Sequence, residues 1–341
     1  MKALKVLNTI ALAIPLFIAF LSLFAEELLL FAVISTMATG FIQVITGIFF
    51  WYAYPKNGYI KFYFFLVILF FTSLFFSIFN NWIWYLPPLL CFLLSVLVYS
   101  TNSQKSSFMH AEWNDLALIN YEINPKLLEQ YIPKGTEIDL WNGKCYLSLI
   151  GFMFENVKVL GIKVPYHVNF EEVNLRFYVK RLEDGKWKRG AVFIKEIVPK
   201  HAITIVANTL YREHYQTLNM RHSRTENDTS KTFQYEWKKD KKWNSIAVKA
   251  NKITQAIEEN SEAEFITEHY YGYTKFNEDK TIEYEVRHPR WQQLEVIETL
   301  IDVYFDLIYG KNFAFLQNLK PTSTYLAIGS KITIEGKKII K

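Results

Sequence analysis

Cysteine is scarce in this chain of 341 residues, which contains only Cys91 and Cys145. The two residues lie in regions of different composition, which argues against a structural disulfide and favours a reducing compartment for the region around Cys145. The seven histidines are scattered, and neither histidine nor cysteine occurs in pairs at zinc-ligand spacing. Glycine-rich phosphate loops and nucleophile elbows are also missing. We therefore predict no metal site and no cofactor.

A basic stripe is missing too, although the formal net charge is +5. The densest basic cluster is Lys238-Lys239 with Lys241-Lys242, and Asp240 interrupts it between two strand-like segments. Such a cluster is typical of a solvated hairpin tip rather than a phosphate-binding surface. We predict no nucleic-acid partner.

Charged residues are rare before residue 107, where 5 of the 38 basic and 2 of the 33 acidic residues lie. Four apolar runs fill this region, roughly 7–25, 28–53, 62–79 and 82–99, each near the ~20 residues that a membrane-spanning helix needs. The alternative for the first run is a cleaved signal peptide, but no small-residue cleavage site precedes Glu26. We predict a transmembrane helical bundle of about four spans over residues 1–104.

The lysines of this region predict its orientation. Lys2, Lys5, Lys56, Lys61 and Lys105 fall on one side of the membrane if the spans alternate. The positive-inside rule then makes the N-terminus and everything after residue 105 cytoplasmic in a multi-pass protein of the cell membrane.

One face of the second run carries small and amide residues at helical spacing: Thr36, Gly40, Gln43 and Gly47. Such a face suits helix packing, and no charge lies inside the spans, as a transport pathway would need. We therefore interpret the bundle as an anchor or as a homo-oligomerisation module.

Residues 105–341 are different in kind, with short alternating strands, turn residues and two helical stretches. Asn142-Gly143 and Asp184-Gly185 predict hairpin turns. Eight or more strands with two helices predict an α+β domain dominated by an antiparallel β-barrel or sandwich.

The clearest strand runs from Glu172 to Val179 and alternates without a break. One face is apolar, and the other presents Glu172, Asn174, Arg176 and Tyr178. The local pattern alone favours a solvated polar face.

Two further stretches contain candidate site residues. In the strand 190–198, alternation places Lys195 with Ala191, Phe193 and Ile197, so its ammonium either snorkels from a sheet edge or sits in a pocket with a lowered pKa. A helix that starts at Pro199 brings Tyr211, His214 and Tyr215 to its carboxyl end. This end is either the margin of a core helix or a pocket rim.

Several ordered motifs together resemble the YqjF-like bacterial family of unknown function, a branch of the acetoacetate decarboxylase-like superfamily. They are His110-Ala111-Glu112-Trp113, the Pro-Lys-Gly and Asn-Gly segments, 172–179, the helix end 211–215 and Glu285-Val286-Arg287-His288-Pro289-Arg290-Trp291. The resemblance covers about residues 108–335. It implies a closed, mostly antiparallel β-barrel whose interior is a pocket, with the polar row of 172–179 pointing inward.

The resemblance also limits the chemistry. Acetoacetate decarboxylase forms an imine through a lysine of low pKa, and the positions that match its motif are Arg212 to Gln216 here, without a lysine. We expect a membrane-anchored barrel that binds a small organic acid through Arg176, with Asn174, Tyr178, Tyr211 and Tyr215 as further ligand-binding residues. The alternatives are a lyase-like enzyme that uses Lys195, or His214 with Glu172, and a structural partner-binding module.

Overall fold

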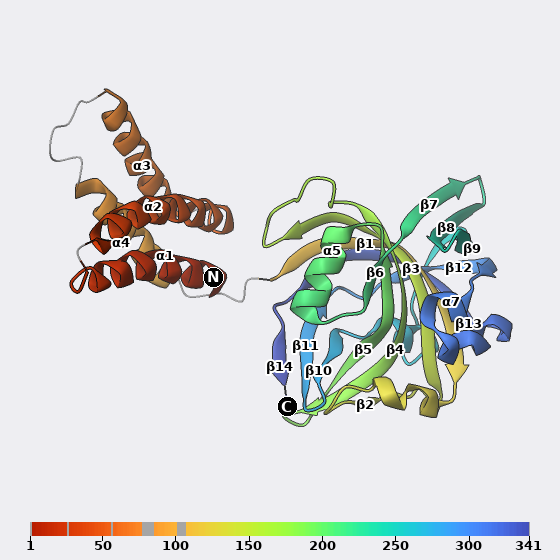
Figure 1. The fold of residues 1–341 in the computed structure, drawn as a ribbon. Coiled ribbons are helices and arrows are strands. Elements are labelled where there is room, and N and C mark those ends of the chain that lie inside the picture. The colour runs from red at the N-terminus through yellow and green to blue at the C-terminus, as the bar shows by residue number, and fades with distance from the viewer. Residues whose placement is uncertain (1, 26, 56, 77–84, 101–106, 341) are drawn as a thin grey trace. The chain divides into compact units, whose positions relative to one another are not determined.

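The structure is a computed structural model that describes residues 2–25, 27–55, 57–76, 85–100 and 107–340 (Figure 1). The chain divides into two compact units, Met1–Ser106 and Ser107–Lys341. The expected boundary at residues 104 and 105 lies outside the described residues, as do Lys56 and Lys105 of the topology prediction.

The first unit is helical. It contains α1 (Lys2–Leu21), α2 (Leu28–Ala53), α3 (Gly58–Phe76) and α4 (Leu86–Ser100). Among the described residues, three helices are long and apolar enough to cross a membrane, at Leu4–Leu21, Leu28–Ala53 and Gly58–Phe75. Three of the about four predicted spans thus have helices of sufficient length, whereas α4 has 15 described residues.

Polar side chains join these helices. The Gln43 amide of α2 donates to Asn8 of α1 over 3.1 Å, and Asn8 donates to Ser95 of α4 over 3.0 Å. Gly47 lets α3 approach, because a Cβ there would lie 2.9 Å from the ring of Tyr63. Gln43 and Gly47 therefore pack between helices as expected, whereas Thr36 and Gly40 are exposed.

The second unit is built on one fourteen-stranded sheet with short helices at its margins (Figure 1). The helical elements are η2 (Pro125–Tyr131), α5 (His201–Val206), the π-helical turn η3 (Ala207–Tyr211), α6 (Glu262–Thr267), α7 (Phe305–Tyr309) and η4 (Lys311–Asn318). The strands are β1 (Met109–Ile123), β2 (Glu137–Ile138), β3 (Cys145–Val159), β4 (Phe170–Glu183), β5 (Lys186–Val198), β6 (Tyr215–Thr217), β7 (Asn219–Glu226), β8 (Ser230–Lys239), β9 (Lys242–Ala256), β10 (Tyr271–Asn277), β11 (Lys280–Arg287), β12 (Gln292–Asp302), β13 (Ser323–Ile334) and β14 (Lys338–Ile340).

The sheet is mixed rather than wholly antiparallel. Its order is β14-β11-β10-β5-β4-β3-β1-β13-β12-β9-β8-β7, and β5 pairs in parallel with both β10 and β6. Two residue pairs, Val286 with Ile334 and Arg287 with Thr333, also join β11 to β13. The last strand of the path β11-β10-β5-β4-β3-β1-β13 is thus hydrogen-bonded to the first.

The predicted turns form where their residues tolerate positive φ. Asn142 and Gly143 have φ of 50° and 80°, and Asp184 and Gly185 have 51° and 74°. Asp240 and Lys241 take the same conformation at the tip of the β8–β9 hairpin. The interrupted lysine cluster is thus a hairpin tip, as predicted.

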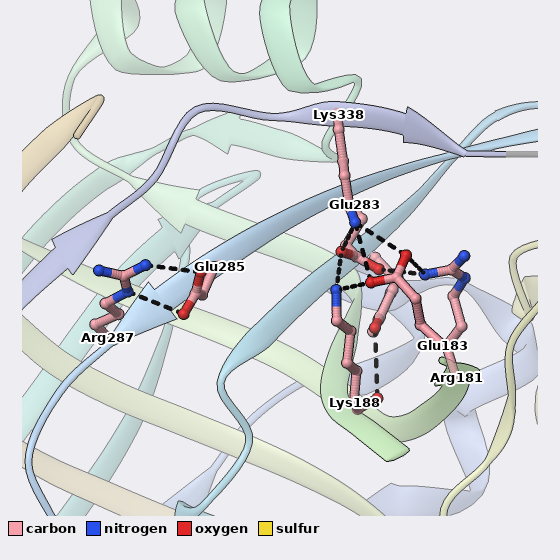
Figure 2. A network of polar contacts seen from close by, with 8 residues as sticks. Arg181, Glu183, Lys188, Glu283, Glu285, Arg287 and Lys338 are labelled. Atoms are coloured by element: carbon pink, nitrogen blue, oxygen red, sulfur yellow. Dashed lines mark hydrogen bonds and ion pairs between the residues drawn. The ribbon is translucent and has the colours of Figure 1, made fainter. Parts of the chain in front are cut away.

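An ionic network fastens the C-terminal strand to the sheet. Figure 2 shows the buried Glu283 of β11 among Arg181 of β4, Lys188 of β5 and Lys338 of β14. Its carboxylate lies 3.0 Å from Arg181 Nη1, 3.1 Å from Lys188 Nζ and 2.9 Å from Lys338 Nζ. Glu183 is a second anion for the same three cations. Four strands therefore meet at one charge cluster.

Candidate functional site

The alternation of β4 divides the domain into two faces. Val173, Leu175, Phe177 and Val179 are fully buried in the larger apolar core. Glu172, Asn174 and Arg176 lie on the other face, where they line an inner chamber of about 80 Å³. Tyr178 also lies on that side but is packed away, with its hydroxyl 2.8 Å from Ser148 Oγ. The polar row of this strand is thus enclosed by the fold rather than solvated.

A second, larger chamber of about 310 Å³ adjoins the first. Its walls are almost wholly apolar and include Ile203, Val206 and Ala207 from the helix after Pro199, together with Tyr211. The two chambers share Met109, Phe154, Glu172, Tyr215, Tyr284 and Ile334. The site is therefore an apolar outer chamber that leads to a polar inner one.

Three buried carboxyl groups stand around the junction. Tyr215 donates to Glu172 Oε2 over 3.0 Å, and the Asn174 amide donates to Glu172 Oε1 over 2.9 Å. Glu213 Oε1 accepts from Thr274 over 2.5 Å and from Tyr284 over 2.9 Å. Glu196 of β5 is the third acid and faces the inner chamber. Within the described chain, Glu196 Oε2 and Glu213 Oε2 have no hydrogen-bond partner.

Burial dominates the protonation of these acids. It raises the pKa of Glu172 to about 7 against the lowering effect of the Asn174 and Tyr215 hydrogen bonds. It also raises the pKa of Glu213 to about 7 and that of Glu196 well above its usual range, where the neighbouring carboxyls add to the effect. The site therefore holds protons at neutral pH that ordinary glutamates would have lost.

Arg176 provides the positive charge of the inner chamber. Its guanidinium donates to the Ile266 carbonyl over 3.4 Å and lies 5.4 Å from the centre of the Tyr178 ring. Among the residues that the structure describes, no carboxylate forms an ion pair with it, and its Nε–H has no acceptor. A buried guanidinium with free donors is suited to bind an anionic or acceptor group.

The inner chamber also includes two histidines that the sequence patterns did not single out. His269 Nε2 lies 3.2 Å from Asp139 Oδ2, and Arg189 Nε lies 2.6 Å from the same oxygen. His288 stacks on Trp291 with ring centres 4.2 Å apart. Burial lowers the pKa of both histidines to about 4, so both rings are neutral at neutral pH.

The other predicted candidates lie outside the chambers. A bulge at Ile194 of β5 pairs Leu175 with Lys195 but Arg176 with Phe193. The side chains of Lys195 and Phe193 therefore lie on opposite faces of the sheet. The Lys195 ammonium donates to the Ile308 carbonyl. Burial lowers the pKa of Lys195 there. His214 is exposed, and its Nδ1 lies 3.3 Å from the Phe193 carbonyl. No lysine is among the described residues that line either chamber.

Of the predicted site residues, Glu172, Asn174, Arg176, Tyr211 and Tyr215 line the chambers, and Glu196 and Glu213 line them without having been predicted. Apolar residues flank Lys195 and Glu196 on both sides in Phe193-Ile194-Lys195-Glu196-Ile197-Val198. A charged residue within a mostly apolar strand is the one sequence signal that could have indicated the buried position of Glu196. Glu213 follows Arg212, whose left-handed φ of 56° turns the chain out of the helix. No local pattern predicts that turn at an arginine.

Replacing Glu213 with glutamine is expected to stabilise the fold, and more so at alkaline pH. The folded pKa of about 7 exceeds that of an unfolded glutamate, so wild-type stability falls as pH rises from about 4.5 to 7. Glutamine keeps the acceptor for Thr274 and Tyr284 without the charge. We expect a gain of up to about 3 kcal/mol at pH 8 and under about 1 kcal/mol at pH 5, measured by denaturation of the full chain in detergent.

Glu183→Gln is the control for this experiment. Hydrogen bonds from Lys188, Arg181 and Lys338 hold the pKa of Glu183 well below its usual range. Its stabilising contribution is therefore complete at both pH values, and the variant should lose stability about equally at pH 5 and pH 8. Equal effects of Glu213→Gln at the two pH values would contradict the raised pKa.

Comparison with solved structures defines the class of the second unit. The enduracididine biosynthesis enzyme MppR with HEPES buffer bound aligns with a TM-score of 0.51 at 11% identity, over 68% of this chain and 87% of MppR. MppR complexed with pyruvate gives 0.50 at 11% identity, over 68% and 90%. Acetoacetate decarboxylase from Legionella pneumophila gives 0.47 at 11% identity, over 68% and 87%. The unit therefore shares its fold with MppR.

The sequence comparison defines the family. The profile of the DUF2071 family, described as an uncharacterized conserved protein, matches residues 110–331, and the chain belongs to this family. The uncharacterized protein YqjF of Bacillus subtilis (strain 168) is 27% identical over 114 residues, which are 33% of this chain and 46% of YqjF. The match thus spans less than half the length of that relative. The resemblance predicted from the ordered motifs is confirmed.

Proposed function

We propose that this protein is a membrane-anchored receptor for a small organic acid with an apolar body. The observation that carries the proposal is Arg176: a buried guanidinium, without an ion-pair partner in the described chain, at the polar end of an otherwise apolar cavity. A ligand carboxylate at Arg176 would use donors that the protein leaves free. The ligand's apolar body would then occupy the outer chamber.

The surrounding acids are compatible with an acidic ligand because they can be protonated. Glu172 and Glu213 have pKa values raised to about 7, so one proton taken up at either group offsets the charge that the ligand brings. Binding of the acid should therefore tighten as pH falls through 7. A cationic ligand would show the opposite dependence.

The helical unit supplies the anchor in this proposal. In this proposal its three long apolar helices cross the membrane, and α4, whose described part is shorter, completes an even number of crossings. The lysine bias of the sequence favours a cytoplasmic N-terminus and a cytoplasmic second unit. The pairing of β11 with β13 supports a closed barrel around the inner chamber. Helix packing also allows a homo-oligomer.

A matched pair of ligands tests the proposal. Titration calorimetry of the full chain in detergent would compare 3-methylbutanoate with 3-methylbutanamide, which has the same shape without the charge, and would include pyruvate because MppR is known in complex with it. We expect the acid to bind at least about tenfold more tightly than the amide at pH 6. Equal binding of acid and amide, or tighter binding at pH 8, would overturn the proposal.

A second candidate function is general acid–base catalysis by Glu172. A buried carboxyl whose pKa is about 7, held by the Tyr215 hydroxyl, is suited to proton transfer near neutral pH. The imine route through Lys195 has no support in the geometry, because that ammonium is turned to the Ile308 carbonyl outside both chambers. His214 likewise lines neither chamber.

A further inference from the structure

The outer chamber is bordered by exposed apolar side chains that come from two segments. Loop residues Leu160 and Tyr166 are 57% and 89% exposed, and Ile205 of α5 is 63% exposed. Val164, Val206 and Leu210 are exposed as well. We call these six residues the apolar rim. Val164 and Val206 also line the outer chamber, and each of the other four lies within four positions of one of these two in the chain. Clustered exposed apolar residues mark an interaction surface.

The charges of the same two segments have one sign. Residues 156–169 and 199–212 contain Lys158, Lys163, Lys200 and Arg212, and neither segment contains an aspartate or a glutamate. Lys158, Lys163 and Arg212 are exposed. Apolar and aromatic side chains flanked by basic ones are the composition that binds the interface of a bilayer with anionic lipids.

In the sequence, this surface follows the apolar helices closely. Phe108 and Met109, where the chain enters the second unit, both line the outer chamber. The apolar helix α4 ends at Ser100, and the eight residue steps from there to Phe108 span at most about 29 Å when fully extended. Part of the chamber wall is thus made by the residues with which the chain enters the second unit, a short stretch of sequence after the last apolar helix.

We propose that the apolar rim docks on the anionic surface of the lipid bilayer, and that the outer chamber takes the apolar body of an amphipathic acid directly from the lipid phase. The uptake of the acid from the lipid phase rests on the proposed function. The docking of the rim on the bilayer does not depend on any ligand. Lys158 and Lys163 contact the anionic headgroups in this arrangement, while Leu160, Tyr166 and Ile205 enter the interface.

Spin labelling of the full chain in lipid nanodiscs tests the docking. A nitroxide at Tyr166→Cys would be compared with one at Leu182→Cys, both with Cys91→Ser to remove the partly accessible native thiol. Leu182 is 55% exposed and lies near the β4–β5 turn, at the end of β4 opposite to the Tyr166 loop, so it is a matched control.

In nanodiscs that contain phosphatidylglycerol, we expect the label at 166 to be accessible to dissolved oxygen and shielded from a water-soluble nickel chelate. The label at 182 should show the reverse. Lys158→Glu with Lys163→Glu should reduce the difference in these discs, as should neutral discs of phosphatidylcholine alone. Equal accessibility of both labels to the nickel chelate would overturn the docking.

The uptake of the acid is tested with Tyr166→Asp and Leu160→Asp together, in the same nanodiscs. The double variant should bind water-soluble 3-methylbutanoate as the wild type does, which also shows that it is folded, and should take up decanoate from the disc more than tenfold more slowly. Unchanged decanoate uptake would overturn the uptake. Docking without binding of either acid would instead overturn the proposed function and leave the docking surface in place.

Discussion

Arg176→Met is expected to weaken the binding of 3-methylbutanoate by about 30-fold or more, because truncating one partner of a buried, charged hydrogen bond costs about 2–5 kcal/mol. Methionine fills much of the same space without charge, so the chambers keep their shape. Titration calorimetry at pH 6 measures the loss. Binding of the uncharged amide should change little.

The same variant should not unfold the protein, and this separates binding from stability. The described chain gives Arg176 no ion-pair partner, and replacing a poorly compensated buried charge by an apolar side chain is often neutral or stabilising. We expect an unchanged or higher melting temperature. Arg176→Lys, which keeps the charge but loses the planar fork, should bind the acid with an intermediate affinity. Full acid affinity in Arg176→Met would rule out this residue as the anion site.

Glu283→Gln is expected to lower the free energy of unfolding by about 2–4 kcal/mol. The variant leaves Arg181, Lys188 and Lys338 around Glu183 alone, so three cations share one anion (Figure 2). The expected loss lies below the full cost of an unpaired buried charge because these cations are partly exposed. Chemical denaturation of the full chain in detergent measures it.

Glu285→Gln is the matched control, two residues along the same strand. Glu285 pairs with Arg287, whose side chain is 55% exposed, and such pairs contribute about 0–1 kcal/mol. The same substitution chemistry should therefore have a small effect here. Equal losses of unfolding free energy at the two positions would mean that the burial of Glu283 does not increase the stability that its ion pairs contribute.

The sequence predicted those parts of the fold that short-range patterns encode. The hairpin turns follow from residues that tolerate positive φ, and the alternation of 172–179 gave the two faces of β4 correctly. The ordered motifs predicted the family. The helix after Pro199 was predicted, but the sequence allowed its carboxyl end to be either the margin of a core helix or a pocket rim. Its apolar face lines the outer chamber, its last turn is π-helical, and His214 lines neither chamber.

The remaining parts depend on long-range pairing and could not be predicted. β5 pairs in parallel with β10, which follows it by some eighty residues, and nothing in either strand specifies that partner. His269 joins the site because this pairing brings the segment before β10 to the chamber. Strict alternation also grouped Lys195 with Ala191 and Phe193. A one-residue bulge in β5, opposite Leu175 and Arg176, separates it from them and leaves it on the face of Ile197 alone.

That bulge decides which charge the chamber receives. Without it, and with Ile194 kept, alternation from Phe193 would turn Lys195 inward and Glu196 outward, so a neighbouring pair of opposite charges would exchange places with no change of residue identity. Deletion of Ile194 would instead remove the bulge and keep Glu196 inward, because Arg176 would still pair with Phe193 and Leu175 with Lys195. Whether the chamber contains a third carboxyl or a primary amine therefore depends on the backbone conformation at one residue and not on side-chain identity alone.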